Sequence, residues 1–137
     1  MIIRPALFSE HASILRISKQ SKWTRDFSNH IFSGEALYEK GWVRVAEDTD
    51  ALIGFTCVRH KTRSPVTELY FIGVNRDDHR DGVGRALLAD LQATSPHRCI
   101  ELNVAKDNPA VNFYETLGYS RIGEGLHGTA WRYQLRW

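Results

Sequence analysis

The sequence predicts an α/β fold with a mixed, mostly antiparallel central sheet flanked by about four helices. Short apolar runs suited to strands alternate with amphipathic segments suited to helices. A strand, a helix and a second strand follow one another over residues 67–104, which predicts a parallel strand pair with a right-handed crossover. The length of 137 residues fits one compact domain, so we expect a single domain over residues 1–137.

The N-terminal part predicts one strand and two helices. Residues 2–4 form a short apolar strand, which Pro5 ends. Apolar residues recur at helical spacing over residues 9–20, with Ser9 in the position of an N-cap. A second, irregular helix is expected within residues 20–40.

Three strands follow. Residues 42–47 and 52–59 are strand-like and are separated by Asp48-Thr49-Asp50, a turn signal, so they should form a hairpin. Ser64-Pro65 marks another turn. The apolar run over residues 67–74 is long enough for a strand and too short for a free-standing helix.

A helix and a strand come next. Val83, Leu87 and Leu91 recur every four positions, which is typical of an amphipathic helix. Pro96 ends this helix, and residues 99–104 form the following strand.

The C-terminal part predicts a helix and two strands. Asn108 is placed as the N-cap of the helix, Pro109 as its first residue and Gly118 as its C-terminal cap. The last two strands are expected over residues 119–123 and 129–137, joined by a glycine-rich loop.

Composition excludes several classes of function. The net charge of +2 with no run of like charges argues against a nucleic-acid partner. Cys57 and Cys99 form no CxxC pair, and no metal-ligand spacing is present, so we expect no metal and reduced thiols. The N-terminus does not resemble a signal peptide and no apolar run could span a membrane, so we expect a cytoplasmic protein.

The segment between residues 74 and 88 is the most informative. Gly82-Val83-Gly84 stands at the start of a helix, where unpaired backbone N–H groups favour a phosphate. Taken alone, this pattern favours a simple tight turn over a binding site. The dinucleotide pattern G-x-G-x-x-G is absent because Leu87 occupies its third glycine position.

Two longer motifs connect the chain to a known family. Residues 74–88 read VNRDDHRDGVGRALL and residues 108–119 read NPAVNFYETLGY. They resemble motifs A and B of the GCN5-related N-acetyltransferase (GNAT) superfamily, in the family's order. Residues 3–6 also resemble common openings in the family. The resemblance covers nearly the whole chain.

The resemblance implies a GNAT-like fold and acetyl-CoA as co-substrate. It implies that the pantetheine arm lies along the strand that ends at Val74 and splays it from the strand over residues 99–104. It implies a cofactor site made of Ile72, Gly73, Val74, His79, Arg80, Asp81, Gly82, Val83, Gly84, Arg85 and Asn108. Two positions depart from the pattern: His79 replaces the motif's Arg or Gln, and Asp107 fills the slot where the family usually has the asparagine. Asn108 therefore either contacts the cofactor or acts only as a helix cap.

The resemblance also implies a chemistry. An amine acceptor with a pKa of ~10 must lose a proton before it attacks a thioester, and a carboxylate can take that proton. Glu68 resembles the general-base glutamate of the family, its alternative being an ordinary charged residue on a strand. Tyr114 stands where the family has its general-acid tyrosine, its alternative being a core aromatic residue.

The expected function is transfer of an acetyl group from acetyl-CoA to a primary amine by direct attack in a ternary complex. Three matters stay open. The acceptor is either a protein amine, meaning a lysine or an N-terminus, or a small-molecule amine. A catalytically inactive acyl-CoA-binding or protein-interaction module is the alternative function. Apolar residues at the C-terminus leave room for a homodimer formed by strand exchange.

Overall fold

The computed structural model describes residues 1–29, 34–79 and 81–137. Their contacts divide the chain into two compact units. The first unit comprises residues 1–58 and 71–93, and the second comprises residues 59–70 and 94–137. The two units are described in turn.

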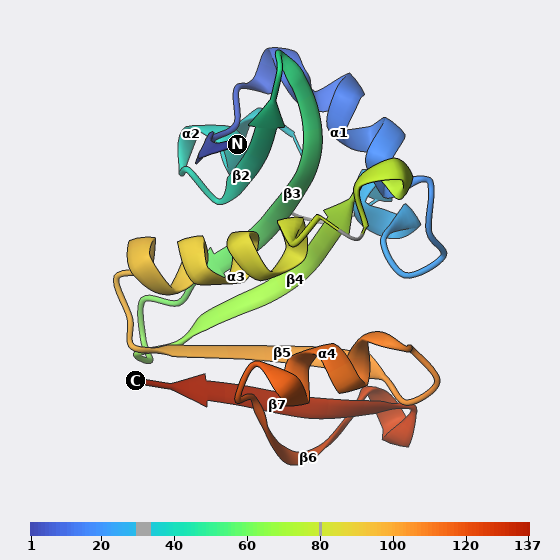
Figure 1. Cartoon of the computed structure of the whole chain (residues 1–137). Coiled ribbons are helices and arrows are strands. Elements are labelled where there is room, and N and C mark those ends of the chain that lie inside the picture. Colours follow the sequence, from blue (N-terminus) through green and yellow to red (C-terminus); the bar gives the residue numbers. More distant parts are fainter. Residues whose placement is uncertain (30–33, 80) are drawn as a thin grey trace. The chain divides into compact units, whose positions relative to one another are not determined.

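The first unit contains an antiparallel sheet with helices around it (Figure 1). Strand β2 pairs antiparallel with both β1 and β3. The strands are β1 (Ile2–Pro5), β2 (Val43–Asp48) and β3 (Ala51–His60). The last two residues of β3 belong to the second unit. The α-helices are α1 (His11–Ser18), α2 (Glu35–Glu39) and α3 (Val83–Thr94), and the 3₁₀ turns are η1 (Phe8–Glu10), η2 (Arg25–Asn29) and η3 (Arg76–Asp78).

Aromatic packing fills one part of this unit's core. The ring of Phe27 lies 5.2 Å from that of Phe55 and 5.5 Å from that of Phe71, measured between centroids. Phe27 and Phe55 are fully buried. These rings join α1, α2 and the sheet into one apolar cluster, so segments far apart in the sequence stabilise each other.

Two glycines allow close packing beside this cluster. A Cβ atom on Gly73 would lie 2.6 Å from Cε1 of Phe55, closer than two carbon atoms can approach. A Cβ atom on Gly54 would lie 3.1 Å from the Gly73 carbonyl oxygen and 3.1 Å from Cγ1 of Val83. The missing side chains therefore make space for the phenyl ring and for helix α3.

The second unit contains four strands and one α-helix (Figure 1). Its strand order is β4-β5-β7-β6. Residues Thr67 to Leu69 of β4 pair parallel with Ile100 to Leu102 of β5, whereas the β5–β7 and β7–β6 pairs are antiparallel. The elements are β4 (Thr67–Val74, whose last four residues belong to the first unit), β5 (Cys99–Ala105), α4 (Ala110–Thr116), β6 (Ser120–Gly125), η4 (Leu126–Gly128) and β7 (Ala130–Arg136).

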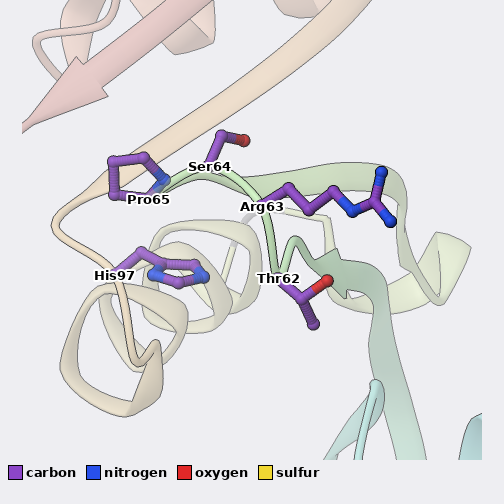
Figure 2. Close-up of a pocket in the computed structure, with 5 residues that line it drawn as sticks. All are labelled: Thr62, Arg63, Ser64, Pro65 and His97. Carbon is purple, nitrogen blue, oxygen red and sulfur yellow. The ribbon is translucent and has the colours of Figure 1, made fainter.

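An open hollow lies at the loop between β3 and β4 (Figure 2). Residues 62–65 and His97 line it. The His97 ring donates a hydrogen bond through Nε2 to the Lys61 carbonyl oxygen at 2.7 Å, which ties the two segments together.

The predicted order of elements is confirmed, as are the parallel pair and the antiparallel neighbours. The strand predicted over residues 67–74 has these bounds in the structure. The described part of the region over residues 20–40 contains η2 and α2 rather than one helix. Strand β6 continues to Gly125, so the last loop is shorter than expected.

The prediction of Ser9 as the N-cap of the first helix is wrong. Helix α1 begins at His11, after a 3₁₀ turn, and its cap has no side-chain hydrogen bond. Glu10 instead organises the segment before α1. Its carboxylate accepts a hydrogen bond from the Leu7 backbone N–H at 2.8 Å and pairs with Arg4 at 2.7 Å. A charge-assisted bond to arginine is stronger than a serine cap, so the chain folds around Glu10.

We expect Gly73→Ala to lower the free energy of unfolding by about 1–3 kcal/mol, because the added methyl group collides with the Phe55 ring. Urea denaturation followed by circular dichroism measures this change. In a Phe55→Leu background the same substitution should cost less, since the colliding ring is gone. An equal cost in both backgrounds would contradict the packing described here.

Candidate functional site

The loop after β4 is held in a compact turn. The Asn75 N–H donates to the carbonyl oxygen of Ile53 on β3 at 2.7 Å, which fixes the point where the chain leaves the sheet. The Asp78 N–H donates to the Asn75 carbonyl oxygen at 2.8 Å, and Asn75 Nδ2 donates to Asp78 Oδ2 at 2.8 Å. The turn is therefore closed twice, once by the backbone and once by side chains.

Gln20, after the end of α1, also binds this loop. Its Oε1 accepts the Arg76 backbone N–H at 2.7 Å, and its Nε2 donates to Asn75 Oδ1 at 2.9 Å. The sequence analysis missed this residue. Its loop partners lie 55 and 56 positions further along the chain, and a single glutamine after a helix carries no local signal.

His79 closes the loop onto the strand. Its Nε2 lies 2.9 Å from the Val74 carbonyl oxygen. Because a carbonyl oxygen can only accept, Nε2 must carry the proton. The residue that departs from the family motif thus bonds to the protein itself, while its ring stays exposed.

The start of α3 offers backbone N–H groups to a ligand. The bond from Ala86 N–H to the Gly82 carbonyl oxygen, 3.0 Å long, is the one that begins the helix. The N–H groups of residues 83–85 fall in the first turn, which has no preceding helical carbonyl groups to bind. Gly82 has a φ of +74° and nothing within 4 Å of the place where a Cβ would be, so the backbone is accessible there.

An anion fits this first turn. The N–H groups of a helix's first turn and the helix dipole both favour negative charge. Side-chain charge adds little, because residues 75–85 contain three arginines and three aspartates. Among the predicted side chains here, Asp81 and Arg85 are exposed, whereas Arg80 lies outside the described residues. A phosphate or pyrophosphate bound at this turn would therefore depend mainly on backbone groups.

The end of β4 places α3. Ile72 and Val74 pack with Val83 and Leu87 of the helix in one buried cluster. Val83 as a whole residue is 1% exposed, so the accessible part of this turn belongs to Gly82, Gly84 and Arg85. The structure thus brings together, within the first unit, the predicted residues Ile72, Gly73, Val74, His79, Asp81, Gly82, Val83, Gly84 and Arg85.

The three other predicted site residues, Glu68, Asn108 and Tyr114, belong to the second unit. Glu68 lies on β4, with its Oε1 3.3 Å from Nζ of Lys61. Burial, with a smaller contribution from its hydrogen bond to Glu68, raises the pKa of Tyr70 to about 12. Glu68 therefore already has two polar neighbours within its own hairpin.

Tyr114 is buried in α4, with 5% of its surface exposed. Burial, with a smaller contribution from Tyr119, raises the pKa of Tyr114 well above its usual range. The two rings lie 5.6 Å apart in an edge-to-face arrangement. The Tyr114 hydroxyl is consequently neutral near pH 7 and can donate a hydrogen bond.

Asn108 caps α4. Its Oδ1 accepts the Ala110 N–H at 2.9 Å, and its carbonyl oxygen accepts the Val111 N–H at 3.2 Å. Asp107, at the alternative motif position, is exposed. The helix-cap role of Asn108 is thus present in the structure, and it places the helix that carries Tyr114.

Other kinds of site find little support in the part of the chain that the structure describes. There, no group of three or more His, Cys, Asp or Glu side chains could hold a metal ion. None of the described helices is long and apolar enough to cross a membrane. Cys57 and Cys99 are free and buried, and burial raises the pKa of Cys57 to about 12, so its thiol is a poor nucleophile.

One protein-family model matches most of the sequence. The model of the acetyltransferase (GNAT) family matches residues 5–119, which include the β4 loop, α3 and α4. The chain belongs to the GNAT acetyltransferase family. As a member, it is an acyltransferase, and the resemblance of the two sequence motifs is confirmed.

Individual relatives agree. A 5-NmdU N-acetyltransferase of Pseudomonas phage PaMx11 is 47% identical over 130 residues, covering 93% of each chain. A mycothiol acetyltransferase of Actinosynnema mirum is 36% identical over 86 residues, which are 59% of this chain and 28% of that protein.

Solved structures share the fold. The PaiA N-acetyltransferase of Thermoplasma acidophilum, in complex with coenzyme A, aligns with a TM-score of 0.78 at 16% identity, covering 99% of this chain and 98% of the other. The diaminobutyrate acetyltransferase EctA of Paenibacillus lautus, in complex with its substrate and coenzyme A, aligns with a TM-score of 0.70 at 16% identity, covering 98% and 93%.

We expect Asn108→Ala to lower the free energy of unfolding by about 1 kcal/mol, because the Ala110 N–H loses its acceptor. Asn108→Asp retains an acceptor oxygen and should be close to wild type in stability. Thermal denaturation of the two variants measures the difference. Coenzyme A affinity of Asn108→Asp, by calorimetry, separates the two roles: a value equal to wild type indicates a cap, and a loss of about tenfold or more indicates that the Asn108 amide also contacts the cofactor.

Proposed function

We propose that the chain transfers the acetyl group of acetyl-CoA to a primary amine, by direct attack in a ternary complex. The observation that carries the proposal is the open first turn of α3 beside the end of β4, inside the region that the family model matches. Coenzyme A complexes of structural neighbours with the same fold support it. Acetyl-CoA supplies the activated acetyl group as a thioester.

The cofactor-binding part of the proposal rests mainly on backbone groups. The N–H groups of Gly82 to Arg85 bind the pyrophosphate, with Arg80 and Arg85 adding charge. His79 and Asp81 complete the loop around it. The backbone of Ile72 to Val74 hydrogen-bonds the pantetheine arm and polarises the thioester carbonyl group, where N–H donors stabilise developing negative charge.

Tyr114 is the proposed general acid. Its neutral hydroxyl donates a hydrogen bond to the sulfur atom that leaves, which disperses the negative charge that forms there. A phenol whose pKa is raised holds its proton more tightly than a thiol does. Tyr114 therefore shares its proton in the transition state, and the product thiol finally takes a proton that the amine has released.

Glu68 is the proposed general base. The acceptor amine is protonated near neutral pH and must lose a proton before it can attack. Glu68 pairs with Lys61 and accepts a hydrogen bond from Tyr70, and in this proposal its carboxylate receives the proton of the amine directly or through a water molecule. The amine nitrogen loses two protons in all: Glu68 accepts one before attack and passes it to solvent, and the second, released as the N–C bond forms and the C–S bond breaks, protonates the leaving thiolate.

The acceptor is the second part of the proposal. The phage relative, whose alignment covers 93% of this chain, is named for 5-NmdU. At 47% identity over this length, a shared acceptor class is the simplest reading, so we propose the amine of 5-NmdU. A protein lysine, a protein N-terminus and another small amine are the alternatives. A nucleoside acceptor does not require the large positive charge of a nucleic-acid-binding protein, and the net charge is +2.

The alternative function considered from the sequence, an inactive acyl-CoA-binding or protein-interaction module, is disfavoured by the family membership. Retention of Tyr114 and Glu68 favours the enzyme, as does the family. Two free cysteines fit a reducing compartment, which supports a cytoplasmic location as part of the same proposal.

Gly82→Asp combined with Gly84→Asp should abolish micromolar binding of acetyl-CoA in calorimetry, because two carboxylates enter the proposed pyrophosphate site. Gly41→Asp is the matched control: Gly41 has a φ of +70° and open space around its Cβ position, as Gly82 has, so the backbone strain is similar. The control should bind as wild type does. Absence of binding by the wild type would overturn the proposal.

Tyr114→Phe should lower kcat by about 10²–10⁴-fold with little change in KM for acetyl-CoA, because the donor to the leaving group is lost. Tyr119→Phe is the control, since its hydroxyl is buried and has no hydrogen-bond partner among the described residues. Steady-state release of coenzyme A thiol measures both. Equal rates for the two variants would remove Tyr114 from the mechanism.

Acetyl transfer to 5-NmdU, as free nucleoside and within an oligodeoxynucleotide, can be followed by mass spectrometry beside a lysine-containing peptide. We expect one of the 5-NmdU forms to react with at least about tenfold higher kcat/KM than the peptide, which corresponds to about 1.4 kcal/mol in the transition state. A peptide that reacts faster than both forms would contradict the proposed acceptor and leave the transferase activity standing.

A further inference from the structure

We infer that Gln20 is a positioning residue for the cofactor loop: its side-chain amide holds residues 75–78 in the binding conformation before acetyl-CoA arrives. The inference rests on the proposed function, because it concerns the same loop. All the contacts involved lie within the first unit.

The hydrogen bonds around Gln20 form a series in which each donor and acceptor is fixed by its neighbours. The Arg76 backbone N–H can only donate, so the Gln20 atom that faces it at 2.7 Å must be the oxygen, Oε1. The Gln20 nitrogen, Nε2, must then face Asn75, where it donates to Oδ1 at 2.9 Å. Asn75 is left with its own nitrogen toward Asp78, whose carboxylate accepts at 2.8 Å.

Gln20 and Asn75 each use both the oxygen and the nitrogen of the side-chain amide. A carboxylate in place of Gln20 could accept from Arg76 but could not donate to Asn75. An apolar side chain could do neither. The requirement is therefore for an amide at residue 20, and it is set by a backbone N–H at one end and a carboxylate at the other.

Gln20 itself is held by the end of α1. Its N–H donates to the Ile17 carbonyl oxygen at 3.1 Å, and the Thr24 hydroxyl donates to the Ser18 carbonyl oxygen at 2.6 Å. The Gln20 amide therefore projects from a fixed turn onto the loop. Gln20 and Asn75 are both partly buried, so water competes less for these bonds than at a fully exposed site.

The consequence for binding is pre-organisation. Residues 75–78 lead from β4 to the first turn of α3, so their conformation sets where the N–H groups of that turn lie. A loop already held in place loses less conformational entropy when a ligand binds. Loss of the amide should therefore weaken cofactor binding without changing the chemical step.

Gln20→Met tests this, because methionine keeps the length of the side chain and removes both hydrogen bonds. We expect the Kd for coenzyme A and the KM for acetyl-CoA to rise by ~5–30-fold, as loss of two such bonds implies, with kcat within about twofold of wild type. Gln92→Met on α3 is the matched control, the same substitution at a side chain for which no hydrogen bond is found within the described part of the chain. It should leave Kd unchanged.

Hydrogen exchange without cofactor gives an independent readout. The Arg76 amide should exchange faster in Gln20→Met than in wild type, while the amides of β2 keep their protection. In an Asn75→Ala background, Gln20→Met should raise Kd by a smaller factor than in wild type, because one of its two partners is already missing.

The outcomes are distinguishable. A wild type that binds no coenzyme A overturns the proposed function and this inference with it. A wild type that binds coenzyme A, with Gln20→Met equal to it in Kd and Arg76 exchange, overturns the inference alone. A fall in kcat with unchanged KM, or an equal effect of Gln92→Met, overturns it as well.

Discussion

The packing of α3 against the strands of the first unit is the constraint on which the candidate site depends. Val83 and Leu87 pack into the cluster that includes Ile72 and Val74, and Gly54 allows the helix to approach the sheet. An ion pair reinforces this position: Arg44 on β2 donates two hydrogen bonds, of 2.7 and 3.0 Å, to the carboxylate of Asp90 on α3. Because the buried face fixes the helix, its open first turn stays at the end of β4.

The short loop between β4 and α3 determines which groups are left to bind a ligand in the proposed site. Its side chains mostly bind the loop itself: Asn75 binds Asp78, and His79 binds the carbonyl group of Val74. The groups left for a ligand are backbone N–H groups, which are the same for any sequence that keeps the turn. This explains how His79 can stand where the family motif has Arg or Gln. Gly82, with φ of +74°, is the position at which residue type matters most for the backbone.

Hydrophobic periodicity in the sequence predicts the elements whose ends depend on neighbouring residues alone. The strand over residues 67–74 and the helix from Val83 have clear periodicity and clear ends, so both could be predicted. The motif over residues 74–88 predicts a cofactor-binding role for the loop after β4, which remains part of the proposed function. Gln20 could not be found, because its role depends on two partners brought near only by folding. Ser9 was mistaken for a cap since the pairing of Glu10 with Arg4 is a tertiary contact.

The central claim is that acetyl-CoA binds to the backbone at the start of α3. Hydrogen exchange with mass spectrometry, with and without acetyl-CoA, tests it most directly. The account predicts that exchange slows upon binding at the amides of residues 76–85, with the segment over residues 61–66 and His97, at the hollow in Figure 2, unchanged. Slower exchange confined to the hollow, with no change over residues 76–85 at saturating acetyl-CoA, would contradict it.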